Sequence, residues 1–335
     1  MMNTNWLKLS KERKIEILNQ ATELTGLPSI AIEKDWWVTL ALKASFSMPY
    51  SKNIIFKGGT SLSKGWNLIE RFSEDVDLAI DRKYFGFKGD LTKTQIKKLR
   101  KLSCEFISTT FLEDLKKTLT EWGAISECKL IAQPIKDSDK DPQTIEIYYN
   151  SVVDKSDYLP QRILIEISSR SLMEPTEIRE INSILSDTFS TQTFATVPFQ
   201  VATVLPQRTF LEKVFLLHEE FSQNNQKIRI DRLSRHLYDI EKLMDTSHGV
   251  DALKNSKLYN GIVAHREIFN ALRGLNYANH TSNNINITPP ESVIKDYEMD
   301  YSEMTKFMIY GEFLKFEKLI TRIIELQTRI NNLEN

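Results

Sequence analysis

The sequence lacks the usual features of disulfide-rich, zinc-binding, exported and membrane-spanning proteins. Only two cysteines, Cys104 and Cys128, occur in 335 residues, and their spacing fits neither a disulfide framework nor a zinc site. No run of about 18 apolar residues exists, and the N-terminus lacks the apolar segment of a signal peptide. The formal net charge of −1 excludes a uniformly basic nucleic-acid coat. We therefore expect a soluble, cytoplasmic protein without membrane contact.

What the chain does contain is the composition of a globular protein with two parts. Hydrophobic residues make up 41% and charged residues 27% of the sequence. Helical periodicity covers residues 9–46, after which short strand-like runs alternate with helices. From residue 207 the pattern is almost entirely helical and ends in a predicted helix over 304–332. We predict an α+β domain over residues 1–206 and a helical domain over 207–335.

Within the α+β part, strand-like and helix-like segments follow one another closely. Helical patterns cover 62–71 and 92–122. The polar stretch 136–143 is predicted to connect two strands as a hairpin. Short apolar or alternating runs bounded by turn residues predict strands over 54–56, 76–80, 128–135, 144–149, 162–168 and 199–205.

The segment Phe56–Lys64 passes from a strand through two glycines into a helix. Gly58 and Gly59 leave backbone N–H groups open to a phosphate, and the small hydroxyls of Thr60 and Ser61 follow directly. Lys64 is a further nucleotide-binding candidate. Taken alone, the turn has an equally good geometric explanation, because many strand-to-helix turns require glycine.

A pair of aspartates follows the turn on a predicted strand. Alternate side chains of a strand share a face, so Asp75 and Asp77 point the same way while Val76 and Leu78 face the core. Such close anions repel each other unless cations bind there, as two divalent ions roughly 3.5–4 Å apart would. The alternative is the polar face of a solvent-exposed strand. The order of phosphate turn, helix and aspartate pair favours a transferase of the polymerase-beta-like kind.

Several motifs along the chain resemble the AbiEii/AbiGii toxin family of nucleotidyltransferases, which belongs to bacterial abortive-infection and toxin–antitoxin systems. The resemblance covers most of the chain. The matching segments are Ile32–Trp37, Lys57–Leu62, Arg71–Leu78, Arg235–Asp239 and Met308–Gly311.

The resemblance implies a polymerase-beta-like mixed sheet with flanking helices, followed by a helical domain. It implies a nucleoside triphosphate (NTP) as substrate, two Mg²⁺ ions and an antitoxin encoded nearby. Some members modify the acceptor end of transfer RNA and stop translation. The family's phosphate turn matches Gly58, Gly59 and Ser61, its metal pair matches Asp75 and Asp77, and Ser73 matches a position beside the pair that can itself be modified.

A third metal carboxylate is expected in such enzymes. Glu166 is our candidate, because an acid within the otherwise apolar run 163–168 is costly without a cation or a donor beside it. Glu146 is the competing candidate. For either residue, the alternative is a carboxylate of an edge strand that faces water.

The helical part offers candidates on two helices. Lys213 lies at the border of an apolar stripe, where a lysine usually reaches out to water; the resemblance favours a role in binding the triphosphate. Arg232, Arg235, His236 and Asp239 are predicted to form one helical stripe. Such a stripe is commonly a solvated face. The resemblance instead favours Asp239 as the residue that orients Lys213 or the acceptor, with Arg235 on a phosphate.

A basic stretch stands out between Lys88 and Lys101, where six basic residues accompany one acid, Asp90. Lys93, Lys97, Arg100 and Lys101 share a predicted helical face that would bind an RNA backbone in a salt-sensitive way. A solvated face is the favoured interpretation of this pattern.

Together with these motifs, the resemblance implies a metal-dependent toxin that transfers a nucleotide from an NTP to RNA, with the 3′ end of tRNA as the expected acceptor. Two alternatives stay open. The acceptor would be a protein hydroxyl in the first, and the chain would be a nucleotide-binding or antitoxin-binding module without catalysis in the second.

Overall fold

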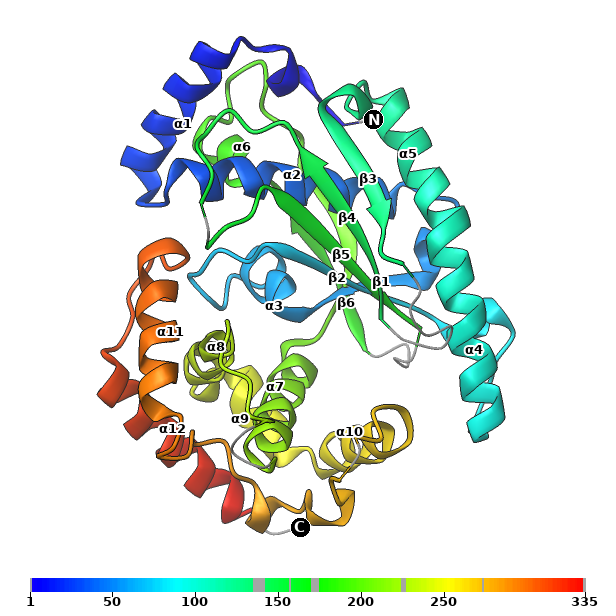
Figure 1. Cartoon of the computed structure of the whole chain (residues 1–335), viewed down its shortest axis with the longest axis vertical. Helices are drawn as coiled ribbons and strands as arrows, with labels where there is room; N and C mark the ends of the chain where they lie inside the picture. The colour runs from blue at the N-terminus through cyan, green and yellow to red at the C-terminus, as the bar shows by residue number, and fades with distance from the viewer. Residues whose placement is uncertain are drawn as a thin grey trace. The chain divides into compact units, whose positions relative to one another are not determined.

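The computed structural model describes residues 2–134, 142–156, 158–169, 175–223, 227–272 and 274–333, drawn as a ribbon in Figure 1. The chain forms two compact units. Unit 1 comprises residues 1–67 and 71–204, and unit 2 comprises residues 68–70 and 205–335. The stretch 136–143, predicted as a hairpin connection, lies largely outside the described residues. No helix in these ranges is long and apolar enough to cross a membrane.

Unit 1 is built on a seven-stranded mixed sheet. The β1–β7 and β2–β5 pairs are parallel, and the other pairs are antiparallel. This sheet confirms the predicted α+β class. In spatial order its strands are β3 (Cys128–Ala132), β4 (Gln143–Tyr149), β5 (Arg162–Ser168), β2 (Asp75–Ile80), β1 (Ile54–Lys57), β7 (Phe199–Val204) and β6 (Thr176–Ile181).

Helix α2 (Ser29–Phe46) crosses the sheet in Figure 1 and is buried along most of its length. Its apolar side chains are buried around most of the helix, as expected for a helix in a core. The Trp37 ring stacks on Tyr149 of β4 at a centroid distance of 5.2 Å. Helix α1 (Lys11–Thr25) begins at the Ser10 cap and ends at Gly26, whose φ of 75° is the left-handed conformation of a helix terminator. Helix α2 thus fixes the centre of unit 1.

The predicted helical stretch 92–122 is confirmed. Helix α4 (Lys93–Phe106) starts with a capping box between Thr92 and Gln95, and it continues through η5 (Ile107–Phe111) into α5 (Leu112–Glu121). These helices run along the β3 side of the sheet in Figure 1. The remaining short helices of unit 1 are η1 (Asn5–Lys8), η2 (Ser51–Asn53), η4 (Arg82–Phe85), η6 (Ile125–Glu127) and α6 (Ile184–Thr188).

One sequence-based prediction for unit 1 was wrong, and one strand was missed. The predicted helix over 62–71 starts earlier, as α3 (Gly58–Thr60) and η3 (Ser61–Gly65), and it stops at Gly65. The Arg179 guanidinium donates to the Gly65 carbonyl at 2.8 Å and so satisfies the helix end. Strand β6 was missed because its alternating charged residues suit an edge strand, a pattern that does not resemble a buried one.

Unit 2 is helical, as predicted. Its last helix was wrongly predicted as one piece over 304–332. The chain leaves helical form at 308–315, where the Tyr310 N–H donates to the Glu70 carbonyl at 3.1 Å. A Cβ on Gly311 would overlap the Glu70 side chain. The helices are α7 (Pro206–Phe221), α8 (Ser234–Met244), α9 (Ser247–Lys254), α10 (Ser256–Phe269), α11 (Ile294–Phe307) and α12 (Phe316–Asn331), with η8 (Tyr277–Asn279) and η9 (Ser282–Asn284).

A buried histidine makes the stability of unit 2 depend on pH. His218 is 4% exposed, and its Nδ1 accepts a hydrogen bond from the Asn286 N–H at 3.1 Å. Its ring lies 4.7 Å from that of His280, and Glu219 and Arg266 form a buried ion pair nearby. Burial, followed by the electrostatic effect of the neighbouring His280, lowers the pKa of His218 from 6.5 to about 4. The folded protein therefore holds this ring neutral.

We expect the stabilisation from neutral His218 to be complete above pH 6.5 and to be lost as the pH falls towards 4. The unfolded chain takes up the proton first in this window, so acid favours unfolding. Between pH 7 and pH 5 the free energy of unfolding should fall by about 2 kcal/mol from this group. Urea unfolding at both pH values measures the loss. In His218→Asn, whose carbonyl can still accept from Asn286, that portion of the loss should disappear; an unchanged pH dependence would contradict the assignment.

Candidate active site

The glycine turn and the aspartate strand touch each other in unit 1. Gly58 adopts φ 75°, and a Cβ placed on it would lie 1.9 Å from Asp77 Oδ2 and 2.8 Å from Asp77 Cβ. Only a residue without a side chain allows this approach. The register also pairs Lys57 with Asp77 across β1 and β2. The first glycine of the turn therefore lies directly against one carboxylate of the pair.

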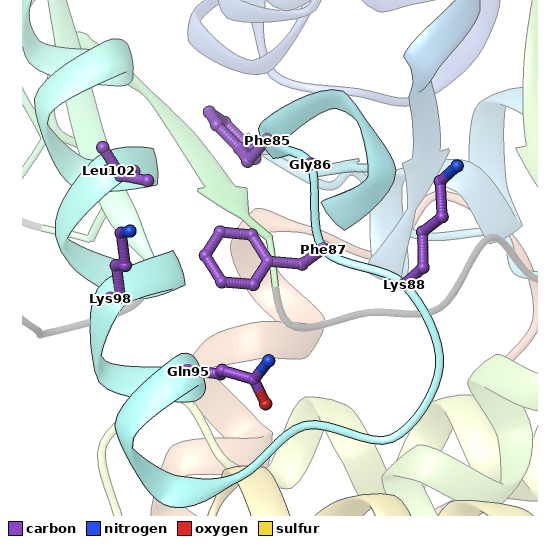
Figure 2. A pocket seen from close by; sticks show the side chains of 7 residues that line it. All are labelled: Phe85, Gly86, Phe87, Lys88, Gln95, Lys98 and Leu102. Carbon is purple, nitrogen blue, oxygen red and sulfur yellow. The ribbon is translucent and has the colours of Figure 1, made fainter.

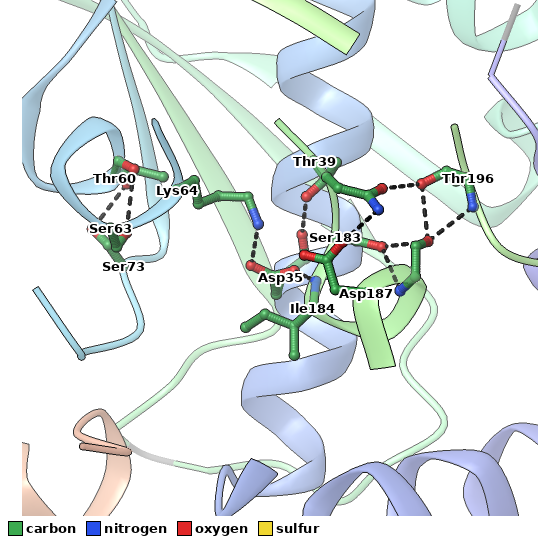
Figure 3. A network of polar contacts seen from close by, with 12 residues as sticks. Asp35, Thr39, Thr60, Ser63, Lys64, Ser73, Ser183, Ile184, Asp187 and Thr196 are labelled. Carbon is green, nitrogen blue, oxygen red and sulfur yellow. Dashed lines mark hydrogen bonds and ion pairs between the residues drawn. The ribbon is translucent and has the colours of Figure 1, made fainter. Parts of the chain in front are cut away.

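Hydroxyl groups tie the next residues of the turn to the aspartate strand. The Thr60 hydroxyl is hydrogen-bonded to the Asp75 carbonyl, and it lies 2.8 Å from the Ser73 hydroxyl (Figure 3). The Ser61 hydroxyl donates to the Gly58 carbonyl at 2.8 Å. Both Thr60 and Ser73 are buried. Small hydroxyls at these positions hold the turn and the segment 73–75 in one geometry.

Arg71 is a site neighbour that sequence reasoning did not single out. Its side chain is 1% exposed, and its guanidinium donates to the Phe72 carbonyl at 3.1 Å. A Cβ on Gly59 would lie 2.7 Å from Arg71 Nη2. The second glycine of the turn thus makes room for a buried guanidinium, which brings positive charge to the site.

Three carboxylates share one face of the sheet. Asp75 and Asp77 alternate on β2 with Val76 and Leu78, which are fully buried on the other face. On the neighbouring parallel strand β5, Glu166 is in register with Asp77. Paired residues of adjacent strands present their side chains to the same side, so Glu166 lies beside the aspartate pair.

Glu146 has other partners. Its carboxylate forms an ion pair with Arg162 and accepts from the Tyr148 hydroxyl at 2.8 Å. Glu146 is on β4 and pairs with Leu164 of β5. Strand β5 therefore separates Glu146 from β2. The geometry therefore favours Glu166 over Glu146 as the third carboxylate of the site.

The donor set suits a hard cation. In the described ranges, no group of three or more histidine, cysteine or acidic side chains is arranged to hold a metal ion. Mg²⁺ is commonly bound by one or two carboxylates together with substrate phosphates, without an all-protein cage. Asp75 and Asp77, with Glu166 alongside, fit that mode of binding when a triphosphate is present.

Charged residues of α2 support the site. Asp35 forms an ion pair with Lys64 at 2.6 Å and accepts from the Ile184 N–H at 2.7 Å (Figure 3). Lys34 forms a buried ion pair with Glu74, the residue before Asp75, and donates to the Pro160 carbonyl at 2.8 Å. Each charge has a partner, as buried charges require. The ammonium of Lys64 is thus bonded to Asp35.

Unit 2 brings three of its own candidates together. The Lys213 ammonium lies 2.9 Å from Asp239 Oδ2 and 3.1 Å from His236 Nδ1. Asp239 is 0% exposed and Lys213 is 7% exposed. This pairing excludes the solvated-face interpretation for Asp239. Arg235 is half-buried in the first turn of α8.

Arg232 was wrongly placed on the helix with these residues. Helix α8 begins at Ser234, and Arg232 lies before it with a φ of 60°. Its N–H donates to Asp300 at 2.7 Å, which stabilises this left-handed turn. The helical periodicity of the sequence does not reveal such a turn, because Arg232 falls in phase with the following helix.

In unit 1 a mixed sheet thus sets a glycine turn against an aspartate pair. The family model described as "Nucleotidyl transferase AbiEii toxin, Type IV TA system" matches residues 41–322. The chain belongs to this family and is a nucleotidyltransferase toxin of a type IV toxin–antitoxin system. An NTP substrate and an antitoxin partner follow from that membership.

Three solved structures match most of the chain, and the first of them, with a TM-score above 0.5, shows a similar fold. MenT4, a nucleotidyltransferase toxin from Mycobacterium tuberculosis, matches with a TM-score of 0.55 and 15% identity, over 97% of this chain and 91% of that one. JHP933 from Helicobacter pylori has a TM-score of 0.43 at 15% identity, over 91% and 93% of the two chains. A putative nucleotidyltransferase from H. pylori has a TM-score of 0.44 at 15% identity, over 90% and 94%. No curated protein sequence matches the chain.

Proposed function

We propose that this toxin transfers a nucleotidyl group from an NTP to RNA, with the 3′ end of tRNA as its acceptor, and that the modified RNA arrests growth in the bacterial cytoplasm. The observation that supports the proposal is the close approach of Gly58 to Asp77, because a triphosphate held by the turn would then lie next to the carboxylates. The tRNA acceptor and the link to abortive infection come from the family resemblance described above.

In this proposal the acceptor hydroxyl attacks the α-phosphorus in line. A new oxygen–phosphorus bond forms, the bond from the α-phosphorus to the bridging oxygen breaks, and pyrophosphate leaves. Asp75, Asp77 and Glu166 would hold two Mg²⁺ ions, which would supply positive charge to neutralise the developing charge and to polarise the phosphoryl group. The turn, from Gly58 to Ser61 with Ser73 beside it, cradles the triphosphate.

Residues outside the turn have supporting roles. The resemblance assigns Lys213 to the triphosphate, with Asp239 orienting its ammonium and Arg235 on a phosphate. The 2.9 Å pair between Lys213 and Asp239 supports the orienting role. Lys64, bonded to Asp35, acts by holding the helix that follows the turn.

An acceptor assay tests this proposal. Purified protein, Mg²⁺ and each of the four α-labelled NTPs are incubated with total cellular RNA and, separately, with cellular protein. We expect label in a band of tRNA size that RNase removes and protease does not. Label that protease removes would instead indicate that the acceptor is a protein hydroxyl. Absence of label with all four triphosphates would contradict nucleotidyl transfer to RNA.

A further inference from the structure

A pocket of unit 1 lies in the segment that follows β2, outside the turn and the carboxylates described above. Its volume is about 590 Å³, within the range of small-molecule sites. Figure 2 shows the Phe87 ring turned towards the side chains of α4. The lining residues are Phe85, Gly86, Phe87, Lys88, Gln95, Lys98 and Leu102. We call residues 82–102 the basic aromatic surface.

This surface concentrates positive charge in a chain of net charge −1. Residues 82–101 hold one acid, Asp90, against Arg82, Lys83, Lys88, Lys93, Lys97, Lys98, Arg100 and Lys101. All six lysines are exposed, and none of their ammonium groups forms an ion pair or hydrogen bond with another described residue. Elsewhere in the described residues the exposed Lys306 does form such a pair, with Glu303. These unpaired cations suit a row of phosphates.

The aromatic residues beside the lysines form a fixed platform. The Tyr84 ring is 5.3 Å from both Phe85 and Phe106, and Phe85 is 5.6 Å from Phe106. Tyr84 is 41% exposed and Leu102 is 37% exposed. An aromatic ring and an apolar side chain are therefore accessible next to the lysines. Unpaired bases stack on aromatic rings held in this way.

Gln95 adds a directional polar group to the pocket. Its Oε1 accepts from the Thr92 N–H at 2.9 Å and from the Thr92 hydroxyl at 3.0 Å. The capping box therefore fixes the amide, and it leaves the Nε2 group as a donor at the pocket. An amide donor beside apolar walls suits the edge of a nucleobase.

We infer that the basic aromatic surface binds an unpaired segment of the RNA acceptor, with lysines on its phosphates and one base in the pocket. The inference rests on the proposed function, which makes RNA the acceptor. Strand β2 runs from Asp75 to Ile80 and η4 begins at Arg82, so the surface starts five residues beyond Asp77, at most about 18 Å away along the chain. An acidic polypeptide would pair with the lysines but has no base to occupy the aromatic pocket.

Binding of a fluorescent single-stranded RNA, followed by anisotropy without NTP, tests the inference. The charge variant is K93Q/K97Q/K98Q/K101Q, and its matched control is K11Q/K254Q/K257Q/K318Q, four exposed lysines elsewhere. We expect the charge variant to bind at least about tenfold more weakly than the control. Its log–log salt slope should be smaller by about 3, since each single-strand phosphate contact contributes roughly 0.7.

A second variant tests the pocket independently of charge. Phe85→Leu should weaken RNA binding by roughly tenfold through lost stacking, with an unchanged salt slope. Melting temperatures check that each variant is folded. If the charge variant binds RNA as tightly as its control, the inference is overturned. The proposed function would stand in that case as long as the wild type still labels RNA. Poly-glutamate binding as tight as RNA binding, with no effect of Phe85→Leu, would also overturn it.

Discussion

Replacing Asp77 by asparagine is expected to lower the rate of nucleotide transfer by at least about a hundredfold. Asparagine keeps the shape of the side chain, and therefore its fit against Gly58, but it removes the negative charge that faces the cations. A carboxylate that holds a catalytic metal contributes several kcal/mol to transition-state stabilisation, and about 1.4 kcal/mol corresponds to a factor of ten. The initial rate of α-label incorporation measures the effect.

Asp251→Asn is the matched control, because Asp251 is an exposed aspartate on α9. That variant should transfer at the wild-type rate. Asp75→Asn should lower the transfer rate about as much as Asp77→Asn does. Glu166→Gln should lower the rate less, because Glu166 lies beside the pair on β5. Full activity in a folded Asp77→Asn protein would contradict a catalytic role of this carboxylate.

Gly58→Ala is expected to cause the second large loss of activity. The new methyl group would lie 1.9 Å from Asp77 Oδ2 and 2.8 Å from its Cβ, so the aspartate side chain must move away from the turn. Alanine at φ 75° adds a backbone cost of roughly 1–2 kcal/mol. Because a 1 Å displacement of a catalytic group costs about a hundredfold, we expect a loss of that order in the rate.

Gly26→Ala separates the two effects. Gly26 has the same φ of 75°, and a Cβ placed on it would meet no atom within 4 Å. This variant should lose a similar amount of backbone stability and keep its activity. Equal transfer rates in the two variants would show that the approach of Gly58 to Asp77 has no role in catalysis.

Much of unit 1 could be predicted because local patterns determine it. The alternation of Asp75 and Asp77 with buried residues gives the strand and its polar face, and the run 162–168 coincides with β5. The periodicity of 92–122 gives the long helical stretch. In each case the burial of one face is encoded within a few neighbouring residues.

The support of the site could not be predicted, because its partners are distant in sequence. The adjacent charges Lys34 and Asp35 stand out in an apolar helix, but their partners Glu74 and Lys64 follow only from the tertiary structure. The end of η3 at Gly65 depends on Arg179 of β6, more than 100 residues away. The break at 308–315 depends on Glu70 in the same way.

The most direct test of nucleotidyl transfer compares the same NTP labelled at its α- or its γ-phosphate, incubated with protein, Mg²⁺ and RNA. We expect label from the α-phosphate to enter the RNA and label from the γ-phosphate to appear only in pyrophosphate. In Asp77→Asn, we expect neither α-label in RNA nor γ-label in pyrophosphate. Incorporation of the γ-label, or of the α-label by Asp77→Asn at the wild-type rate, would contradict a nucleotidyltransferase built on Asp75 and Asp77.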